Sequence, residues 1–542
     1  MSVRDPAADG GSRAHSRAVL ALVIVAVVIG AALVADVVME TGTAMPTEPV
    51  PQETAQAGTW YCPATAGEEE SAVLSVASVG EEPSRVTVVR YPDRQATPAE
   101  AVDVAPGEEH TVVLGPGEAT TPVAVRWQGG PAAATWRVEA GDAPAAPCES
   151  APSEEWHLAG LDTAGGAASI VHLFNPFAVD AVARVTFSTP EGRIALLLTD
   201  NVLVEAGSSA RIDLGEFQPE QPDLGATVEV LTGRLVAQGE LILEPVGDQG
   251  GPRGRDLIPA AHAASSSWSF GYARIDDTSS SWLSVVNTGD REAAVEVRVS
   301  NPAPEATAQE HSVPAGGVVR IDLAELSQEA EFGVAADSVN EVPIVVHRLT
   351  TLRAGDRDGL AISRGGQAAT TSALIGAGEG PRRGRVSVYN PGTQPVQIDV
   401  VTPAEDPPEW RGVEIEPNGW RTFHLGDVDP TRTQIPVVVR ASGPVVAELR
   451  SHYQSGPLRL WTAVGVPSQA WTGAATRPPV RRDPALSTMP LDEGEPGAPT
   501  PPPGPGELPA LPAPEGEGEP NAPPDAPPGE GTDPGGAPSP DS

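Results

Sequence analysis

The stretch ASIVHLFNPF at residues 168–177 alternates apolar and polar residues and then breaks at Asn-Pro. Three further stretches have this form: SAVLSVASVG (71–80), SSWLSVVNTG (280–289) and RGRVSVYNPG (383–392). Alternation with a period of two places one face in a core, so each stretch predicts a β-strand. Asn and Gly tolerate the positive φ of tight turns, so the break predicts a hairpin to the apolar-polar segment that follows.

Two later blocks recur in the same order, one of which contains RIDL at residues 211–214 and 320–323. The marker residues Ser78, Asn175, Asn287 and Asn390 lie 97, 112 and 103 positions apart. A period near 100 residues with about seven short strands is typical of one immunoglobulin-like sandwich per copy. The sequence therefore predicts an all-β fold of about four tandem immunoglobulin-like β-sandwich repeats, at residues 59–150, 151–262, 263–368 and 369–475.

An uncharged apolar segment lies near the N-terminus, at residues 18–35. Arginines precede it and acidic residues follow it, so we expect a single-pass transmembrane signal anchor at 18–39, with residues 1–17 in the cytoplasm and the C-terminus outside. A cleaved signal peptide is the alternative, but no small-x-small site follows closely. Either way the bulk of the chain is exported. Residues 40–58 are polar and contain Pro, which predicts a stalk.

The chain is strongly acidic, with 34 basic residues, all of them Arg, against 73 acidic ones and a net charge of −39. No basic face is available to displace counterions, which excludes nucleic acid as a partner. Residues 476–542 are rich in Pro and acidic residues, and such a tail is expected to be disordered. One interpretation is an extended spacer or a segment that attracts cationic partners. The other is a solvating segment without a partner.

Two cysteines, Cys62 and Cys148, bracket the first copy. In an exported domain an even count indicates a disulfide. Two separate buried thiols are the alternative. A catalytic thiol is disfavoured because no His lies near Cys62 in the sequence and no CxxC pair exists.

The sequence contains no nucleophile elbow, HExxH site, phosphate loop or EF-hand loop. We interpret the RIDL aspartates, Asp213 and Asp322, as a solvated strand face, because other copies hold Val113 and His424 in that slot. His157 and His172 are expected at the surface. Asp427 and Asp429 form a short acidic turn without a third ligand in register for calcium. The sequence thus predicts no catalytic residue, no metal and no cofactor.

Two tryptophans in the fourth copy are the candidate binding surface. Phe423 and Leu425 align with the inward residues of the RIDL strands, so alternation predicts that Trp420 points outward. The same argument places Trp410 outward, beside Glu414. Three uses remain open for Trp410 and Trp420: a platform that stacks a sugar ring, an interface between modules, or core packing if the register differs.

The N-terminal anchor, the WYC opening (60–62), the NPF and NPG breaks, the RIDL strands and the connector PRGRDLIPAAHAASSSW (252–268) together resemble uncharacterised actinobacterial proteins grouped as domain-of-unknown-function family 5719. The resemblance covers about residues 59–473. It implies an exported, membrane-associated protein of a Gram-positive envelope and carries over no functional residue.

We therefore expect a non-catalytic, membrane-anchored extracytoplasmic protein of the cell envelope, acting as a scaffold or binding module for envelope proteins or cell-wall glycans. One alternative is an accessory subunit of a membrane enzyme of cell-wall polysaccharide synthesis. Another is a glycan-acting hydrolase with dispersed carboxylates, which sequence cannot select among 73 acidic residues.

Overall fold

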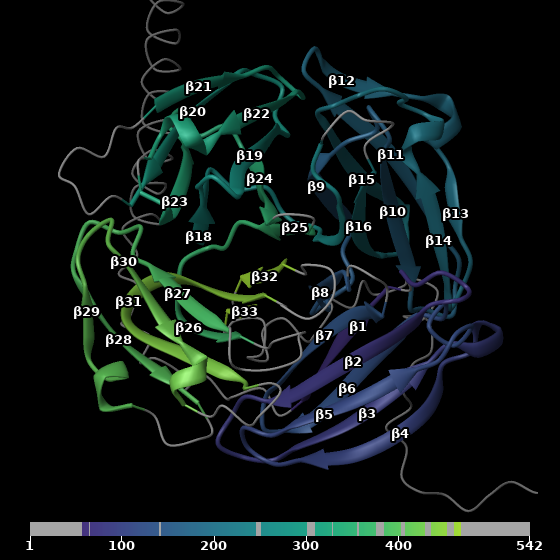
Figure 1. Cartoon of the computed structure of the whole chain (residues 1–542). Helices are drawn as coiled ribbons and strands as arrows, with labels where there is room; N and C mark the ends of the chain where they lie inside the picture. Colours follow the sequence, from purple (N-terminus) through teal and green to yellow (C-terminus); the bar gives the residue numbers. More distant parts are fainter. Residues whose placement is uncertain are drawn as a thin grey trace, which may run out of the picture. The chain divides into compact units, whose positions relative to one another are not determined.

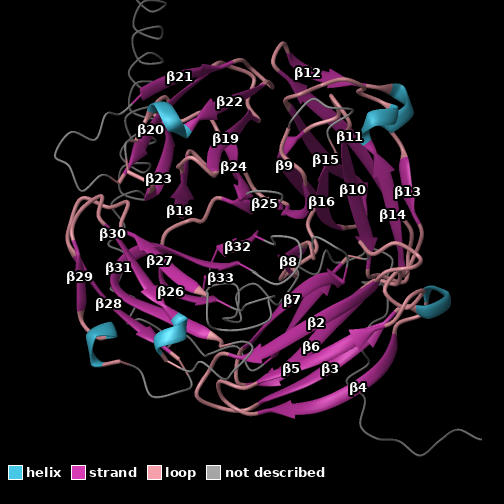
Figure 2. Cartoon of the chain, in the orientation of Figure 1, coloured by secondary structure: helices cyan, strands magenta, loops and turns pink. Residues whose placement is uncertain are grey.

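The structure, a computed structural model, describes residues 57–467 apart from 64, 140–142, 245–250, 301–308, 328, 355–356, 375–383, 403–406, 429–434, 453–459 and 465. In these residues the chain is all-β, and every helix is a short 3-10 turn (Figure 2). None of these turns has the length or apolar character that a bilayer crossing requires. The predicted anchor, the predicted tail and the stalk up to residue 56 lie outside the described residues.

The first two-sheet unit, module 1, spans residues 57–149 (Figure 1). Its sheets have the strand orders β1-β6-β3-β4 and β5-β2-β7-β8. Its elements are β1 (Ala57–Cys62), β2 (Ser71–Ser78), β3 (Ser84–Arg90), η1 (Pro92–Arg94), β4 (Thr97–Val104), β5 (Glu109–Leu114), β6 (Val123–Gly129), β7 (Ala132–Glu139) and β8 (Ala145–Pro147).

Module 2, residues 153–261, has the same plan, with sheets β12-β11-β15-β9 and β14-β10-β16-β17. Two short strands, β12 and β13, share the edge of β11. The elements are β9 (Glu155–Leu161), β10 (Ala167–Asn175), β11 (Ala181–Thr189), β12 (Gly192–Ala195), η2 (Leu197–Thr199), β13 (Val202–Val204), β14 (Ser208–Asp213), η3 (Leu214–Glu216), β15 (Leu224–Thr232), β16 (Val236–Leu243) and β17 (Gly254–Pro259).

Module 3, residues 265–366, has sheets β18-β23-β20-β21 and β22-β19-β24-β25. Its order therefore repeats that of module 1 strand by strand. The elements are β18 (Ser267–Arg274), β19 (Ser279–Asn287), β20 (Ala293–Val299), β21 (Gln309–Val313), β22 (Val318–Asp322), η4 (Leu323–Glu325), β23 (Glu331–Ser338), β24 (Ile344–Ala354) and β25 (Arg357–Arg364).

Module 4, residues 369–467, differs because one long strand, β31, runs through both of its sheets. The described strands from residue 460 on complete this module: β32 pairs with β31 and β33 pairs with β26. The elements are β26 (Ala369–Leu374), β27 (Arg385–Tyr389), β28 (Val396–Val401), η6 (Pro408–Trp410), β29 (Val413–Ile415), β30 (Trp420–His424), η7 (Leu425–Asp427), β31 (Val437–His452), β32 (Leu460–Val464) and β33 (Val466–Pro467).

The strands after each marker residue do not form the predicted hairpins. β2 belongs to one sheet of module 1 and β3 to the other, and β10 and β11 divide between sheets in the same way. The connection therefore crosses the core instead of turning back along one sheet. Alternation fixes which side chains face inward, but it carries no information about which sheet a strand joins.

None of the three marker asparagines has the positive φ that a tight turn would require. They act instead through hydrogen bonds of their side chains. The buried Asn175 amide donates to the carbonyls of Val179 (2.8 Å) and Val204 (3.0 Å) and accepts from the Phe177 amide (3.1 Å). Asn287 and Asn390 make the equivalent bonds. Each thus ties its own connection to the strand of the opposite sheet, which explains why Asn recurs at this position.

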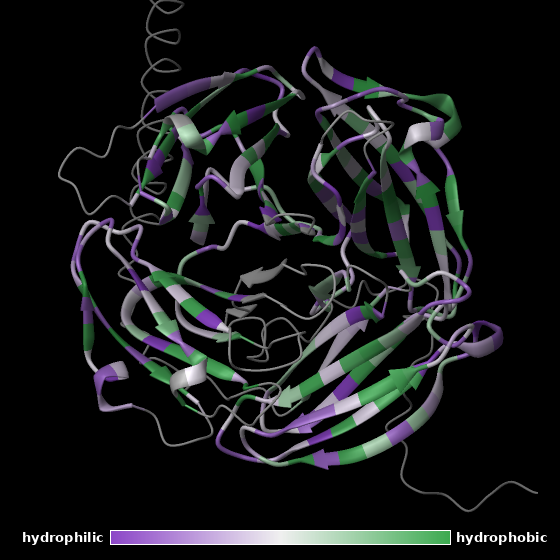
Figure 3. Cartoon of the chain, viewed as in Figure 1, coloured by the Kyte–Doolittle hydropathy of each residue, from purple (hydrophilic) through white to green (hydrophobic). Residues whose placement is uncertain are grey.

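A tryptophan in the opening strand fixes the two sheets of modules 1–3 to each other. The indole N–H of Trp60 donates to the Ala132 carbonyl at 2.7 Å, and those of Trp156 and Trp268 donate to the Leu235 and Ile344 carbonyls at 2.8 and 2.7 Å. All three rings are buried in the cores of their modules. Each ring thus supplies apolar area while its polar atom remains hydrogen-bonded. The alternation of apolar and polar residues along the strands is visible in Figure 3.

The last strands of successive modules lie against one another: β17 contacts β8 and β25, and β25 contacts β32. The buried carboxylate of Asp256 on β17 joins three modules, because it accepts from the Ile362 amide on β25 (2.7 Å) and from the Ala145 amide on β8 (3.3 Å). β32 in turn contacts β8, so module 4 contacts module 1. The modules are therefore packed against their neighbours and are not separate units joined only by linkers.

Modules 3 and 4 are joined by buried ion pairs. The Arg348 guanidinium donates two hydrogen bonds to the Glu448 carboxylate, at 2.9 and 2.6 Å, and both side chains have no exposed surface. Arg450 pairs with Glu331 of module 3 at 2.8 Å and lies over the Tyr272 ring at 3.9 Å. The bidentate geometry satisfies charges whose burial would otherwise be costly.

Modules 1 and 2 share a partly buried network around Glu240 and Arg255. Arg255 bonds Glu240 and pairs with Glu70 of module 1 at 2.6 Å, while His172 bonds Glu240 at 2.8 Å. Burial alone would raise the pKa of Glu240, but the hydrogen bond and charge of His172, followed by Arg255, lower it. This carboxylate therefore stays ionised and holds the two modules together at neutral pH.

His347 connects modules 2 and 3, and its lowered pKa predicts that the protein loses stability in acid. Its Nε2 bonds the Pro259 carbonyl at 2.8 Å, and burial, with Arg364 nearby, lowers its pKa to about 4. Since unfolding restores an ordinary pKa, this histidine's contribution is present above about pH 6.5 and is lost as the pH falls toward 4. We expect the wild type to lose about 2 kcal/mol at pH 5 through this group, measured as the urea midpoint at pH 8 and pH 5.

The control for His347 is His347→Gln, which keeps a donor for the Pro259 carbonyl but does not titrate. The difference in urea midpoint between pH 8 and pH 5 should be smaller in this variant than in the wild type. An unchanged pH dependence would show that the titration of other groups dominates.

Candidate functional site

A pocket of about 240 Å³ lies between modules 2 and 3. We call it the 2/3 pocket. Its apolar lining comes from both modules and includes Leu161 and Leu241 of module 2 and Trp282 and Leu349 of module 3. Three carboxylates, Asp162, Asp223 and Glu244, and the guanidinium of Arg320 supply its charged groups.

The backbone conformation of β9 leaves room for module 3 to pack closely against it. β9 and β15 shift register next to Gly160, which has φ +80°, and a Cβ there would lie 2.6 Å from the Leu349 side chain. The Gly160 amide donates to the Ser284 hydroxyl at 2.8 Å. Irregularities of this kind often lie beside sites, because they redirect the chain. Here the shift leads β9 directly into Asp162 at the rim of the pocket.

The two aspartates are held in a partly desolvated position. Burial raises the pKa of Asp162 to about 6; the Ala164 amide, which donates to it at 2.8 Å, opposes the rise, and the charge of Asp223 adds to it. Burial also raises the pKa of Asp223, and Arg320 counteracts this. Carboxyls with raised pKa values in a cleft are typical of binding and catalytic sites.

Arg320 covers the indole of Trp282, with its guanidinium carbon 3.9 Å from the ring centroid. It lies on β22, within the RIDL segment, and β22 pairs directly with β19, which carries Trp282. The charges of Asp162 and Asp223 both interact with Arg320. Stacking and charge thus fix the guanidinium of Arg320 in the lining of the pocket.

The 2/3 pocket combines an aliphatic interior, two partly desolvated carboxyls with raised pKa values and one stacked guanidinium. This arrangement is suited to a small ligand with an apolar body and polar or basic groups at one end. Its volume is slightly below the range of pockets that enclose drug-sized molecules, so it would hold one ring or a short chain.

The raised pKa of Asp162 predicts that Asp162→Asn stabilises the protein near neutral pH. A carboxyl with a folded pKa above its unfolded value contributes stability at low pH and loses it as the pH rises through about 6. The amide keeps an acceptor for Ala164 and removes the desolvated charge. We expect a gain of about 1–2 kcal/mol at pH 7.5, after discounting for partial exposure, and no gain at pH 4.

The matched control is Asp180→Asn, which also keeps an acceptor for one backbone amide, that of Ala206. Urea unfolding of the wild type and both variants at pH 4 and pH 7.5 measures the effect. A gain of the same size in both variants would contradict a specific role for Asp162.

The sugar-stacking platform, one of the three uses left open for Trp410 and Trp420, is not formed. Trp410 is only 4% exposed, lies in the core of module 4 and packs edge-on against Phe423 at 5.6 Å. It belongs to the short turn η6 and not to a strand, so alternation does not apply to it. Trp420 does leave its own module: its indole N–H donates to the Gly271 carbonyl of module 3 at 2.5 Å. Of the three uses left open, Trp410 serves the core and Trp420 an interface.

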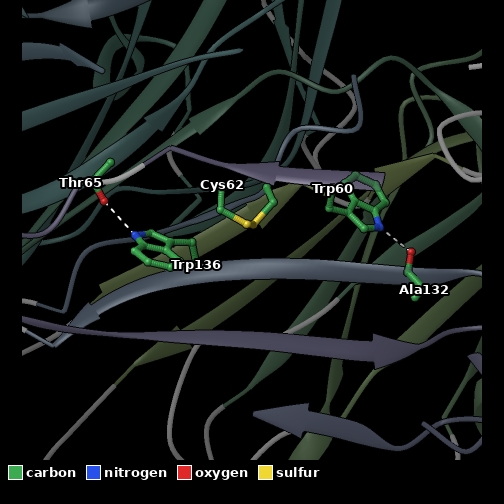
Figure 4. Close-up of a disulfide and its surroundings, with 6 residues drawn as sticks. Trp60, Cys62, Thr65, Ala132 and Trp136 are labelled. Atoms are coloured by element: carbon green, nitrogen blue, oxygen red, sulfur yellow. Dashed lines mark hydrogen bonds between the residues drawn. A yellow bond between two sulfur atoms is a disulfide. The ribbon is translucent and has the colours of Figure 1, made fainter. Parts of the chain in front are cut away.

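Cys62 and Cys148 form a disulfide with a Cα–Cα distance of 4.8 Å. The bond ties β1 to the residue after β8, and Trp60 and Trp136 flank it (Figure 4). The Trp136 indole donates to the Thr65 hydroxyl at 2.9 Å. Both sulfur-bearing residues are buried in the core of module 1.

The predicted surface histidines are buried. His157 contacts the Thr227 hydroxyl at 3.1 Å in one sheet of module 2, and His172 bonds Glu240 in the other sheet. Their polar partners permit this burial, which a sequence pattern cannot reveal. Over the described residues no group of three or more His, Cys, Asp or Glu side chains is arranged to hold a metal ion. Asp429 of the predicted acidic turn lies outside the described residues.

The RIDL aspartates do more than face solvent. The Asp213 carboxylate accepts from the Gly215 amide at 3.0 Å, and Asp322 accepts from the Ala324 amide at 2.9 Å. Each caps the 3-10 turn that follows its strand. The sequence signal that could have revealed this capping role was an aspartate followed by a Leu and a turn. The 2/3 pocket was also missed, because it needs residues from two copies that sequence reasoning treated separately.

Fold and pocket together define an all-β protein of packed two-sheet modules with a pocket between two of them. Residues 129–347 match the sequence model of a family of unknown function, DUF5719. This range includes all of module 2 and most of module 3, and it contains every lining residue of the 2/3 pocket except Leu349. It is shorter than the resemblance over residues 59–473 that we expected. No curated protein matches the chain.

Solved structures give only remote similarity. The crystal structure of Thermotoga maritima 1070 is 18% identical, with a TM-score of 0.18, over 20% of this chain and 96% of that one. The Salmonella alpha-2-macroglobulin reacted with methylamine is 13% identical, with a TM-score of 0.12, over 76% of this chain and 32% of that one. The Streptomyces avermitilis alpha-L-rhamnosidase is 10% identical, with a TM-score of 0.09, over 71% and 53%. These scores carry no conclusion about function.

Proposed function

We propose that this protein is a non-catalytic, membrane-anchored, extracytoplasmic protein of the cell envelope that acts as a scaffold and binding module. In this proposal the four modules are repeats of one immunoglobulin-like unit, held as one body by their contacts. The observation that carries it is the mutual packing of the modules through buried charges such as Arg348–Glu448, which suits a rigid display of surfaces.

Export is supported by the Cys62–Cys148 disulfide, since such bonds persist in oxidising compartments. The apolar segment at residues 18–35 supports anchoring. Within this scaffold the 2/3 pocket is the proposed binding site, and its mixed aliphatic and ionic lining suits a small amphipathic ligand or the end of an envelope polymer.

The test is cross-linking in intact cells followed by recovery of the full chain. Recovery with diffuse wall polymer or several envelope proteins is expected for a scaffold. Recovery of one integral-membrane enzyme would instead establish the accessory-subunit alternative. Labelling with a membrane-impermeant thiol reagent, with and without prior reduction, tests the compartment: only the reduced protein should be labelled.

The paired carboxyls of the 2/3 pocket are the specific observation that favours the second candidate, a glycan-acting hydrolase. Wild type, Asp162→Asn and Asp223→Asn should be compared on a glycan panel. We expect no turnover by any of them. Turnover by the wild type that either substitution abolishes would overturn the non-catalytic assignment.

A further inference from the structure

Exposed large hydrophobic side chains are concentrated on one edge of module 2. Eight such side chains are exposed in the described part of the chain, and six of them belong to module 2. We call these six the apolar edge: Phe177, Val179, Leu197, Leu198, Leu203 and Leu231. The other two, Val113 and Val339, lie singly in modules 1 and 3. Contiguous apolar patches on a protein surface usually mark an interaction site.

Strand pairing brings these residues together. β13 pairs with the start of β11 so that Leu203 is opposite Val182, and Leu231 lies at the irregularity where β15 pairs with Val182. Between β12 and β13 the chain makes the turn η2, which contains Leu197 and Leu198. These two leucines are 90% and 82% exposed.

The apolar edge is held in place by hydrogen bonds. The buried Thr199 hydroxyl donates to the Val185 carbonyl at 2.7 Å and so fixes η2 against β11. The Asn175 amide fixes the neighbouring loop through the carbonyls of Val179 and Val204. The leucines thus point outward from an ordered turn, and their exposure is built into the fold.

The charged groups named here around the apolar edge form ion pairs in which two arginines contact three carboxylates. Arg184 pairs with Asp200 at 2.6 Å and with Glu229 at 3.0 Å. Glu205 pairs with Arg94 of module 1 at 2.6 Å. In a chain of net charge −39 this is a local region of low net charge, which favours an apolar partner over a cationic one.

We propose that the apolar edge inserts into the interfacial region of a lipid bilayer, so that module 2 lies on the membrane that anchors the chain. This inference rests on the anchoring in the proposed function. Twenty-one residues, 36–56, separate the apolar segment from β1, and they reach at most about 75 Å. The tether therefore keeps module 2 near the bilayer at a high effective concentration, so a small insertion suffices.

The experiment reconstitutes the full chain into phosphatidylcholine–phosphatidylglycerol vesicles and labels Leu198→Cys with a fluorophore. Because Cys62 and Cys148 are bonded to each other, the introduced thiol is the site of labelling. Lipids that carry a nitroxide near the headgroup quench a probe at the interface. The matched control is Val113→Cys, a 65% exposed position on module 1. We expect at least about threefold more quenching at position 198 than at 113.

Equal quenching at the two positions, on chains that float with the vesicles, would overturn the insertion while leaving the anchor intact. Disulfide-linked dimers of unlabelled Leu198→Cys, together with an unquenched probe, would also overturn it and assign the edge to a second copy. Chains that do not float with the vesicles would instead contradict the anchoring, and with it the proposed function. As a second variant, Leu197→Ser with Leu198→Cys should reduce quenching at 198.

Discussion

Replacing Glu448 by glutamine is expected to destabilise the packing of modules 3 and 4 by about 3–5 kcal/mol. Glu448 neutralises Arg348 in a site without exposed surface, and it also bonds the Ser363 hydroxyl at 3.3 Å. Without the carboxylate the buried guanidinium loses its bidentate, oppositely charged partner. The loss is measured as the shift of the urea midpoint, followed by tryptophan fluorescence.

The control for Glu448→Gln is Glu81→Gln. Glu81 pairs with Arg440 at 3.4 Å across modules 1 and 4, but the pair is exposed, so the change should cost less than about 0.5 kcal/mol. The double variant Arg348→Met with Glu448→Gln should lose less than the sum of the two single changes, because neither charge of this pair remains. Equal midpoints for wild type and Glu448→Gln would refute the importance of this ion pair.

Removing the disulfide is expected to have the second large effect. The bonded cysteines are 86 residues apart, and closing a loop of this length restricts the unfolded chain by about 4–5 kcal/mol in the chain-entropy account. Cys62→Ser with Cys148→Ser should lower the stability of module 1 by about 2–5 kcal/mol. Thermal unfolding of the double variant, and of the wild type with and without reductant, measures the loss.

The reduced wild type serves as the matched control for this pair of substitutions, since it removes the bond without changing the packing atoms. It should unfold close to the double variant. If reduction leaves the transition of the wild type unchanged, the constraint on the unfolded chain is not what stabilises module 1.

Period-two alternation was sufficient to predict the class of fold and the inward residues. Phe423 and Leu425 are buried as predicted, like Ile212 and Leu214 in their copy. Alternation failed where the chain leaves the strand, as at Trp410 in η6. It also cannot assign a strand to a sheet, which is why the predicted hairpin from β10 to β11 is a crossing between sheets.

The candidate site, the 2/3 pocket, could not be predicted from the sequence for a different reason. Asp162 follows β9 of module 2, while Arg320 belongs to β22 of module 3, so their proximity depends on how modules pack. Internal repetition indicates what each copy has in common, whereas the pocket uses what differs between copies. Buried polar residues such as His347 were equally invisible, because their partners belong to a neighbouring module.

The position of Glu448 in module 4, after module 3 in the chain, has a consequence for biogenesis. Arg348 is translated 100 residues before Glu448, so a nascent third module emerges without the carboxylate that holds this guanidinium in the folded protein. Its final packing must wait until the last module has been synthesised and folded onto it. Chains that terminate early would keep that region open, giving proteases a means to tell incomplete products from finished ones.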